Sequence, residues 1–588
     1  MEKSKTIIVK KLLNSVVALM TMNMLITILG MMIDGIVIGR FLGTDRTAAY
    51  GLVAPVLIIG SLFSGLLSSG AVTQLSQYKS KGETDKFNST FSMVMIEALI
   101  VSLTFFVTVW LARNPISVFL GATGDKAYLQ GYMIQYINGL LPAFPFLLML
   151  ELLSQAIQLD GNRKIPMISI FIMLFVDVAL DLVNVFVVKM DLFGMALATT
   201  LSYFAAAVFL FTHFFSKKCG IKFTLKQLPW KNSWNLIVRG LPNATSRLMS
   251  SARSLLINKI LVVVASSIAV AAYSVNNSAG NLMTAIGNGV ASSCVMITGV
   301  FFADKDSESI KTLLASALKY AFFLSVMLSA IFIIFSKQIT GLFLSGNVEA
   351  LNEASRLIRF YAIYVPFFAI SSVFYSYLQG IQNVKYSNIV CIIGNGGMAV
   401  LCAFILGNLF GATGVWIAFP ISGVLATIGI YIVAWIYQGH MPKSFEDLAF
   451  IPKSLKIDES TMIEASITDK SQITSFSEKV RLFCIEKSHD RYKANRTALC
   501  VEEILFNTFD YGSKGIVNPC VDTRVTCENE IFTIRFRDNC RPFDPKDYFE
   551  NNPKAQSYNH VGIKLVFSNA IDIRHTNVLQ LNNLVVKY

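Results

Sequence analysis

Long apolar runs separated by short polar segments dominate the chain up to about residue 440. A helix that spans a bilayer needs about 20 predominantly apolar residues, and twelve runs reach that length. We therefore predict an all-α membrane part with twelve transmembrane helices. The runs lie near 12–33, 48–74, 91–112, 130–156, 166–188, 194–215, 236–263, 269–300, 314–336, 355–378, 387–408 and 412–437.

Short patterns of the first half recur in the second half at an offset of about 220 residues. Six helices return the chain to the side from which it started, so both halves have the same orientation. Parallel repeats of this kind are common in alternating-access transporters. We predict two parallel six-helix lobes, residues 1–220 and 221–440. The recurring pairs are Gln158 and Gln379, Asn162 and Asn383, Lys164 and Lys385, Gly194 and Gly414, and Ala198 and Ala418.

The chain becomes polar after about residue 440 and has no further spanning run. Residues 441–457 contain two prolines and are predicted to be a linker. Residues 458–588 are predicted to form a cytosolic α+β domain, because short alternating segments and helical patterns follow one another there. Strands are expected at 460–467, 521–528, 530–538 and 579–588, and helices at 469–487, 494–511 and 561–572.

Composition and charge fit this interpretation. Hydrophobic residues make up 54% of the 588 residues and charged residues only 15%, whereas about 25% charged residues is usual in soluble domains. The net charge of +13 is concentrated in loops such as 79–86, 163–164 and 217–231, and such an excess is typical of cytoplasmic loops. We predict a multi-pass protein of the plasma (inner) membrane, with both termini cytoplasmic and no nucleic-acid partner.

The N-terminal run and the cysteines suggest no processing or metal site. The sequence MEKSKTIIVKK leads into the first apolar run without a small-residue cleavage pattern, so we expect a retained transmembrane helix. The nine cysteines include no CxxC motif, and the five histidines show no metal-ligand spacing. We expect reduced thiols and no structural metal.

Two aspartates interrupt the apolar segment LFVDVALDLVNV at 174–185. Asp177 and Asp181 are four residues apart, so they lie on one face of a helix. A charge at mid-bilayer costs at least about 2.5 kcal/mol, so they should face the bundle interior or a water-filled cavity. Such a pair suits a proton or Na⁺, since hard cations take oxygen ligands. The alternative is a structural polar pair that ties helices together.

A third intramembrane acid, Asp34, lies in the first predicted span, and its alternative role is a pair with Arg40. The second half carries cations instead, with Arg247, Arg253 and Lys259 in the seventh span. Its predicted span 387–408, which corresponds to the span with Asp177 and Asp181, has Asn395 and no carboxylate. The acidic site is therefore predicted in the first lobe only.

Several segments in residues 10–440 together resemble the multidrug and toxic compound extrusion (MATE) family. They are MMIDGIVIGRFLG at 31–43, the Gln-x3-Asn-x-Lys segments at 158 and 379, VDVALD at 176–181, GMALATT at 194–200 and GLPNATS at 240–246. The resemblance implies a cation site at Asp34, Asp177, Asp181 and Thr199. Relatives with this site carry asparagine where this chain has Asp177, so the coupling ion and its stoichiometry stay open.

Three segments of the C-terminal region resemble the histidine-kinase-like ATPase fold, closest to the anti-sigma-factor serine kinases. They are VEEILFNTFDYG (501–512), DNCRPFDP (538–545) and HVGIKLVF (560–567). The resemblance assigns magnesium and phosphate binding to Asn507, base catalysis to Glu503, adenine recognition to Asp538 and a phosphate-loop role to Gly562. The departures from the family pattern are Cys540 and His560 in place of glycines and Tyr511 in place of a histidine.

The leading hypothesis is an H⁺- or Na⁺-coupled antiporter that exports small organic, mainly cationic compounds, with a degenerate ATPase-like domain that regulates it and takes Mg-ATP. No other cofactor is expected. One alternative is a lipid-linked sugar flippase of a related fold, which would use a broad basic cavity. Another is a membrane-anchored signalling protein whose C-terminal domain acts on a regulatory protein partner.

Overall fold

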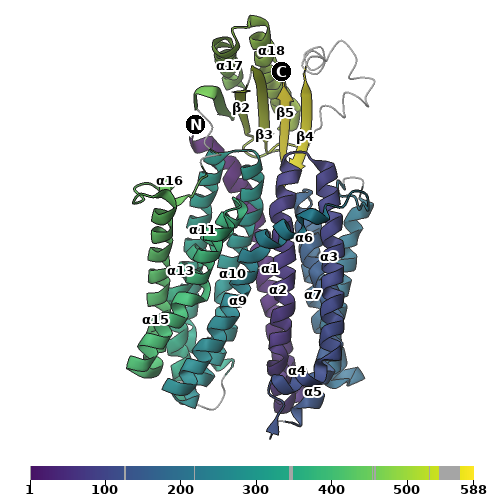
Figure 1. The fold of residues 1–588 in the computed structure, drawn as a ribbon, viewed down its shortest axis with the longest axis vertical. Coiled ribbons are helices and arrows are strands. Elements are labelled where there is room, and N and C mark those ends of the chain that lie inside the picture. The colour runs from purple at the N-terminus through teal and green to yellow at the C-terminus, as the bar shows by residue number, and fades with distance from the viewer. Residues whose placement is uncertain are drawn as a thin grey trace.

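The computed structural model is a bundle of long helices with a small sheet-containing domain at one end (Figure 1). The start of the first helix lies at the same end as this domain. We call this end of the bundle the sheet end. The structure describes residues 2–124, 127–216, 219–343, 348–452, 455, 459–528, 530–541 and 570–588.

The first lobe is built from six crossings. Its long helices are α1 (Glu2–Val37), α2 (Thr44–Ser80), α3 (Thr84–Leu111), α5 (Leu129–Leu140) with α6 (Ala143–Leu159), α7 (Lys164–Val183) and α8 (Asp191–Phe211). Shorter pieces are η1 (Ile38–Leu42), α4 (Arg113–Phe119), η3 (Asn184–Val188) and η4 (Thr212–Phe215). The predicted span 130–156 is not one straight helix, because α5 and α6 meet at a bend of 43°. Pro142 lies at this break, and proline cannot donate the helical hydrogen bond there.

The second lobe repeats this arrangement. Its helices are η5 (Trp230–Asn232), α9 (Ser233–Val264), α10 (Ser267–Ala303), α11 (Ser307–Ile334), α12 (Ser336–Gly341), α13 (Val348–Gly380), α14 (Val384–Ile392), η6 (Ile393–Gly397) and α15 (Met398–Gln438). The predicted spans 387–408 and 412–437 form one continuous run. It changes direction at Gly411, where φ is 62° and ψ is −143°, a conformation that glycine adopts readily.

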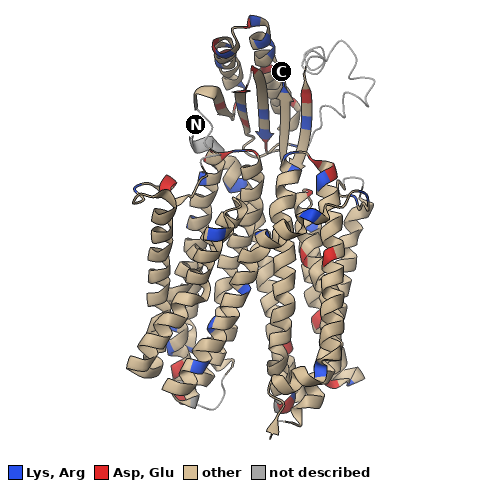
Figure 2. Ribbon diagram, in the orientation of Figure 1, with Lys and Arg blue, Asp and Glu red and all other residues tan. Residues whose placement is uncertain are grey.

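Nine helices of the described residues are long and apolar enough to cross a membrane, or ten if the bent pair α5 and α6 is one span. The run Val384–Gln438 crosses twice because it turns at Gly411. Helix α9 is not among these nine helices because Arg247, Arg253 and Lys259 make it less apolar. At 32 residues, however, it is as long as its neighbours. The twelve-helix prediction is confirmed. Most charged residues lie toward the two ends of the bundle and on the sheet (Figure 2).

The two lobes contact each other toward the sheet end. A Cβ on Gly240 of α9 would lie 1.9 Å from the carbonyl oxygen of Leu66 on α2, and a Cβ on Gly70 would lie 2.2 Å from the carbonyl oxygen of Leu236. Small residues allow helices to approach this closely within a membrane. Gln379 also reaches across and donates to the Ser69 hydroxyl at 2.6 Å. The two lobes diverge toward the opposite end (Figure 1).

The C-terminal domain is an antiparallel five-stranded sheet with two helices on one face. The strand order is β1-β2-β3-β5-β4. The strands are β1 (Met462–Ile467), β2 (Val521–Glu528), β3 (Ile531–Asp538), β4 (Asp572–Val578) and β5 (Leu581–Lys587). The helical pieces, including one in the linker, are α16 (Phe445–Leu448), η8 (Glu459–Thr461), η9 (Lys470–Gln472), α17 (Ile473–Ser488), α18 (Arg491–Asn507) and η10 (Thr508–Gly512).

Four strands and two helices of this domain match the sequence prediction. Strand β4 was not predicted, because its segment DIRHTNV is largely polar. The helix expected at 561–572 is wrong at its end, since Asp572 begins β4. Residues 561–569 lie outside the described residues.

Candidate cation site in the first lobe

Three aspartates from two helices face one another inside the first lobe. Asp34 comes from α1, and Asp177 and Asp181 come from successive turns of α7. Their exposed fractions are 8%, 7% and 0%, and Asp34 interacts electrostatically with both other carboxyl groups. Helices α1 and α7 are in contact here, since a Cβ on Gly30, one turn before Asp34, would lie at the ordinary contact distance of 3.8 Å from Oδ2 of Asp177. We call these three residues the acidic cluster.

The acidic cluster has no basic partner among the described residues. No lysine, arginine or histidine of that part of the chain forms an ion pair with it. One oxygen each of Asp34 and Asp177 and both oxygens of Asp181 are buried without a hydrogen-bond partner there. An unpaired buried carboxylate costs several kcal/mol, which a bound proton or cation removes. Arg40, the predicted alternative partner of Asp34, is exposed and forms no such pair.

Helix α8 supplies the neutral oxygen atoms beside the acidic cluster. The carboxyl group of Asp177 interacts with the side chains of Thr199 and Ser202 as well as with Asp34. The structure therefore brings the predicted Thr199 to the three acids. Sequence reasoning missed Ser202, although it lies three residues after Thr199 and hence on the same helix face. The Ser202 hydroxyl donates to the Thr199 carbonyl at 2.8 Å.

Three tyrosines lie near the acidic cluster, although no local sequence pattern marked them. Tyr50, Tyr136 and Tyr203 each interact electrostatically with Asp34 and Asp177. The rings of Tyr50 and Tyr136 meet edge to face at a centroid distance of 5.3 Å.

Polar contacts hold the ends of α7 and α8 together below the acidic cluster. Asn184 donates to the Asp191 carbonyl at 3.0 Å and accepts from the Met190 amide at 2.9 Å. Arg46 of α2 pairs with the Asp191 carboxylate at 3.1 Å and lies 4.5 Å over the Tyr132 ring. These contacts fix the register of α7 against α8, and hence the position of Asp177 relative to Thr199.

The second lobe carries a cation where the first lobe carries acids. Tyr273 occupies the repeat position of Tyr50, in AAYS and AAYG respectively. It interacts electrostatically with Arg253, which also donates to the Tyr364 hydroxyl at 2.9 Å and to the Tyr361 hydroxyl at 3.4 Å. Asn395 is buried and donates to Ser246. The second lobe thus has no acidic counterpart of the cation site among the described residues.

The arginines that the flippase alternative relies on are engaged with protein groups. Arg247 lies 3.3 Å from the Glu151 carboxylate and donates to the Ser61 carbonyl at 2.9 Å. Arg253 is hydrogen-bonded to tyrosines. Lys259, the third cation on which that alternative relies, is exposed.

Comparison with known proteins identifies the family. The family model described as MatE matches residues 20–183 and again residues 242–405. The chain belongs to the MATE family. The double match also confirms the internal repeat, and it ends before the C-terminal domain begins. The protein is thus a multi-pass membrane transporter.

Known relatives cover the membrane part of this MATE protein. The multidrug export protein MepA of Staphylococcus haemolyticus is 23% identical over 403 residues, which are 67% of this chain and 87% of that protein. The MepA of Staphylococcus aureus is 22% identical over 420 residues, 70% of this chain and 90% of that protein.

Solved structures show the same fold. The MATE transporter VcmN of Vibrio cholerae aligns with a TM-score of 0.68 at 16% identity, over 76% of this chain and 100% of that chain. An outward-facing multidrug resistance MATE family transporter aligns with a TM-score of 0.66 at 22% identity, over 72% of this chain and 94% of that chain.

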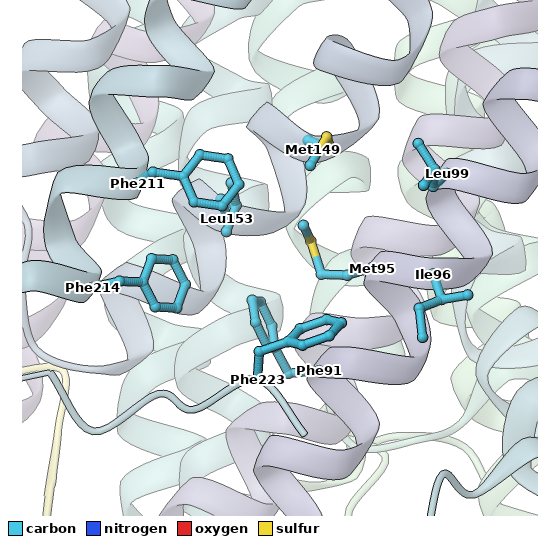
Figure 3. A pocket seen from close by; sticks show the side chains of 9 residues that line it. All are labelled: Phe91, Met95, Ile96, Leu99, Met149, Leu153, Phe211, Phe214 and Phe223. Carbon is cyan, nitrogen blue, oxygen red and sulfur yellow. The ribbon is translucent and has the colours of Figure 1, made fainter. Parts of the chain in front are cut away.

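The first lobe also holds an apolar pocket of about 380 Å³ (Figure 3). Its walls come from α3, α6, α8, η4 and the segment before α9. The lining side chains are Phe91, Met95, Ile96, Leu99, Met149, Leu153, Phe211, Phe214 and Phe223. None of these residues belongs to the acidic cluster, so the pocket is a separate site, and its lining suits a hydrocarbon or aromatic group.

Another group of metal-ligand types gathers near the sheet end of the first lobe. Ligand atoms of Asp160, His213 and Cys219 all lie within 4.8 Å of one another, although their sequence spacing gave no sign of it. The Lys79 ammonium lies 2.5 Å from Oδ1 of Asp160, and His213 lies 2.9 Å from Oδ2. The carboxylate therefore already has a cationic partner from the protein. The absence of a structural metal stays a prediction.

The structure describes three of the four predicted nucleotide-binding residues, while Gly562 lies outside the described residues. Glu503 and Asn507 lie one turn apart on α18, and the Asn507 amide donates to the Glu503 carbonyl at 2.7 Å. Asp538 ends β3 with an exposed fraction of 8%. Its Oδ1 accepts from the Cys540 amide and from Asn582, both at 2.8 Å. Burial raises the pKa of Asp538.

Proposed function

We propose that this protein exports small organic, mainly cationic compounds across the plasma (inner) membrane in exchange for H⁺ or Na⁺. The ion would bind Asp34, Asp177, Asp181 and Thr199. The observation that carries the proposal is the acidic cluster, buried and without a basic partner among the described residues. The substrate class follows that of the MepA relatives, which are multidrug export proteins.

Coupling follows from competition between two conformations. A cation at the acidic cluster favours the conformation in which these acids are best neutralised. A substrate that favours the other conformation shifts the equilibrium the other way. Each ligand therefore lowers the apparent affinity of the protein for the other, which is what exchange requires. The positive loops at the sheet end support a cytoplasmic position for both termini.

A vesicle assay tests this function. Everted membrane vesicles should accumulate a fluorescent organic cation such as ethidium when H⁺ or Na⁺ is made more concentrated inside the vesicles than outside. Vesicles without the protein are the control. Uptake that ignores both gradients, with or without ATP present, would refute ion coupling. Selective binding of anionic lipid-linked sugars without any gradient effect would favour the flippase alternative.

Replacing Asp177 by the asparagine that relatives carry should change stoichiometry more than rate. Asp177→Asn leaves Asp34 and Asp181 in place, so we expect gradient-driven transport to continue. The number of ions exchanged per substrate should fall, because one titratable or ion-binding charge is lost. The substrate accumulation ratio measured at several imposed gradients gives this number. An unchanged number of ions per substrate would mean that Asp177 carries no coupling charge.

The C-terminal domain is proposed to regulate transport and to bind Mg-ATP. Asn507 would hold Mg²⁺ and phosphate oxygens, Asp538 the adenine amino group, and Glu503 would lie beside the metal; magnesium prefers such oxygen ligands. The full-length protein in detergent should bind Mg-ATP at millimolar concentration, and Asp538→Asn should weaken binding. Asp510→Asn is the matched control, since Asp510 pairs with Lys470 at the surface. No binding by the parent would leave docking of a regulatory protein as the role of the domain.

A further inference from the structure

The sheet of the C-terminal domain has one apolar face and one basic face. On β2 and β3, alternate residues such as Val525 and Ile534 join the core under α17 and α18. The residues between them put Arg524, Arg535 and Arg537 on the opposite face. Arg524 lies directly across from Arg535 in the strand register. Like charges in this position destabilise a sheet, so the basic face requires acidic partners. The domain itself supplies Glu464, which lies 2.9 Å from Arg524, and Asp522, which lies across from Arg537 in the strand register.

The second lobe supplies two of these partners. Asp304 and Asp306 lie in the turn between α10 and α11. Asp306 lies 2.9 Å from Arg524, 3.0 Å from Arg535 and 2.9 Å from Arg537. Arg537 also pairs with Asp304. All five side chains are buried, with Asp306 at 1% and Arg537 at 2% exposure.

The environment of Arg535 shows how strongly this face depends on the second lobe. Burial, together with the neighbouring Arg537 and Arg524, lowers the pKa of Arg535 to about 10. The Arg537 guanidinium additionally lies 4.8 Å over the ring of Phe301, near the end of α10. Removing the charge of Asp306 would break the one ion pair that Arg535 forms among the described residues, whereas Arg524 would keep Glu464 and Arg537 would keep Asp304. A buried guanidinium without its acidic partner is far more costly than an exposed one.

The first lobe is contacted by a different part of the same domain, the turn between β4 and β5. Val578, Leu579 and Leu581 are at most 7% exposed and belong to the apolar core that includes Leu159 of α6. The backbone is contacted too. Gln580 donates to the Gly161 carbonyl at 3.2 Å, and Arg163 donates to the Leu579 carbonyl. A Cβ on Gly82, after α2, would lie 3.1 Å from the methyl group of Thr576.

The two contacts meet where the lobes themselves touch. Ser80, at the end of α2 in the first lobe, donates to Asp304 of the second lobe at 2.6 Å. Asp304 in turn pairs with Arg537 of the domain. The domain thus lies across both lobes at the end where they are closed (Figure 1).

We propose that the C-terminal domain is a brace that joins the two lobes at the sheet end and favours the conformation open at the opposite end. The proposal rests on the proposed function in one respect, since a transporter must part its lobes at this end during each cycle. Parting requires release of either the arginines from Asp304 and Asp306 or the β4–β5 turn from the first lobe. The brace is therefore an autoinhibitory contact, and a ligand or partner that releases it would speed the cycle.

A distance measurement on the full-length protein tests the brace. Spin labels at Phe119→Cys and Leu342→Cys report the separation of the lobes away from the sheet end, because these positions are 89% and 84% exposed. Cys219→Ser and Cys527→Ser remove the two native cysteines that are not fully buried. Asp306→Asn and, separately, Leu579→Ser weaken the two contacts. Asparagine still caps α11, so the first variant keeps its helix start.

Both variants should add a population with a shorter label distance, while Lys311→Gln should match the parent. Lys311 is the matched control because it pairs with Glu308 and Glu446 at the same end without touching the sheet. Unchanged amide exchange in α17 and α18 shows that the domain stays folded. Parent-like distances in both variants would overturn the brace. A shift in distance in a protein whose transport ignores ion gradients would instead refute only the coupling proposal.

Discussion

Asp181→Asn is expected to abolish ion-driven transport without unfolding the protein. Asp181 is fully buried, and neither of its oxygens has a hydrogen-bond partner among the described residues. Asparagine has nearly the same shape but cannot be protonated or balance a cation. Loss of the charge should reduce gradient-driven uptake in everted vesicles by at least about tenfold, the usual scale of coupling between two ligands. Because an unpaired buried acid is removed, the unfolding temperature should not fall.

The control for this result is Asp45→Asn. Asp45 begins α2 outside the acidic cluster and contacts the Tyr128 hydroxyl at 3.3 Å. It should transport like the parent, whereas Asp34→Asn should fail like Asp181→Asn. Parent-like transport by both Asp34→Asn and Asp181→Asn would remove the acidic cluster from the coupling mechanism.

Gly240→Ala should force the lobes apart at the sheet end. Its Cβ would lie 1.9 Å from the Leu66 carbonyl oxygen, closer than any real contact, so α9 and α2 must separate. Overpacking of this kind costs about 1–3 kcal/mol. We expect a lower unfolding temperature, and in the folded fraction a shift away from the conformation closed at this end. Thermal unfolding and the label distance between Phe119→Cys and Leu342→Cys measure the two effects.

Gly51→Ala is the matched control for helix packing. It lies on α2, the helix against which Gly240 of α9 packs, but no heavy atom lies within 4 Å of a Cβ placed there. Alanine also favours a helix over glycine by about 1 kcal/mol, so this variant should be as stable as the parent or more so. If Gly240→Ala were equally harmless, the close crossing of α2 and α9 would be wrong.

The membrane fold was largely predictable because its signal is local. Apolar runs of sufficient length mark each span, and the run 236–263 was assigned to a span although it carries Arg247, Arg253 and Lys259. The bend at Pro142 was not predicted, since proline within an apolar run reveals neither the angle nor the position of a break. Strand β4 was not predicted because a polar segment that pairs on one edge lacks the alternation of apolar and polar residues that marks a half-buried strand.

The acidic cluster was predictable in part. The four-residue spacing of Asp177 and Asp181 places them on one helix face, and Asp34 was found as a third acid within a span. That Asp34 and Thr199 join the pair in one site came from the family resemblance. Ser202 and the tyrosines were missed because their proximity depends on how α2, α5 and α8 pack against α7. Such contacts between distant segments leave no local pattern.

The basic face of the sheet shows the same limit. The alternation in VDTRVTCE and EIFTIRFRD already places the arginines opposite the apolar core. It does not reveal that Asp306, more than 200 residues earlier in the chain, neutralises Arg524 and Arg535. The sequence of a domain can thus show that a partner is needed without showing where the partner lies.

Exchange itself is measured most directly with the purified protein in liposomes. An ethidium gradient is imposed without any ion gradient, and indicators inside the liposomes follow H⁺ and Na⁺. We predict that the flow of ethidium drives H⁺ or Na⁺ in the opposite direction, and that Asp181→Asn shows no such ion movement. Ethidium flow in the parent with neither ion moving would contradict coupled antiport.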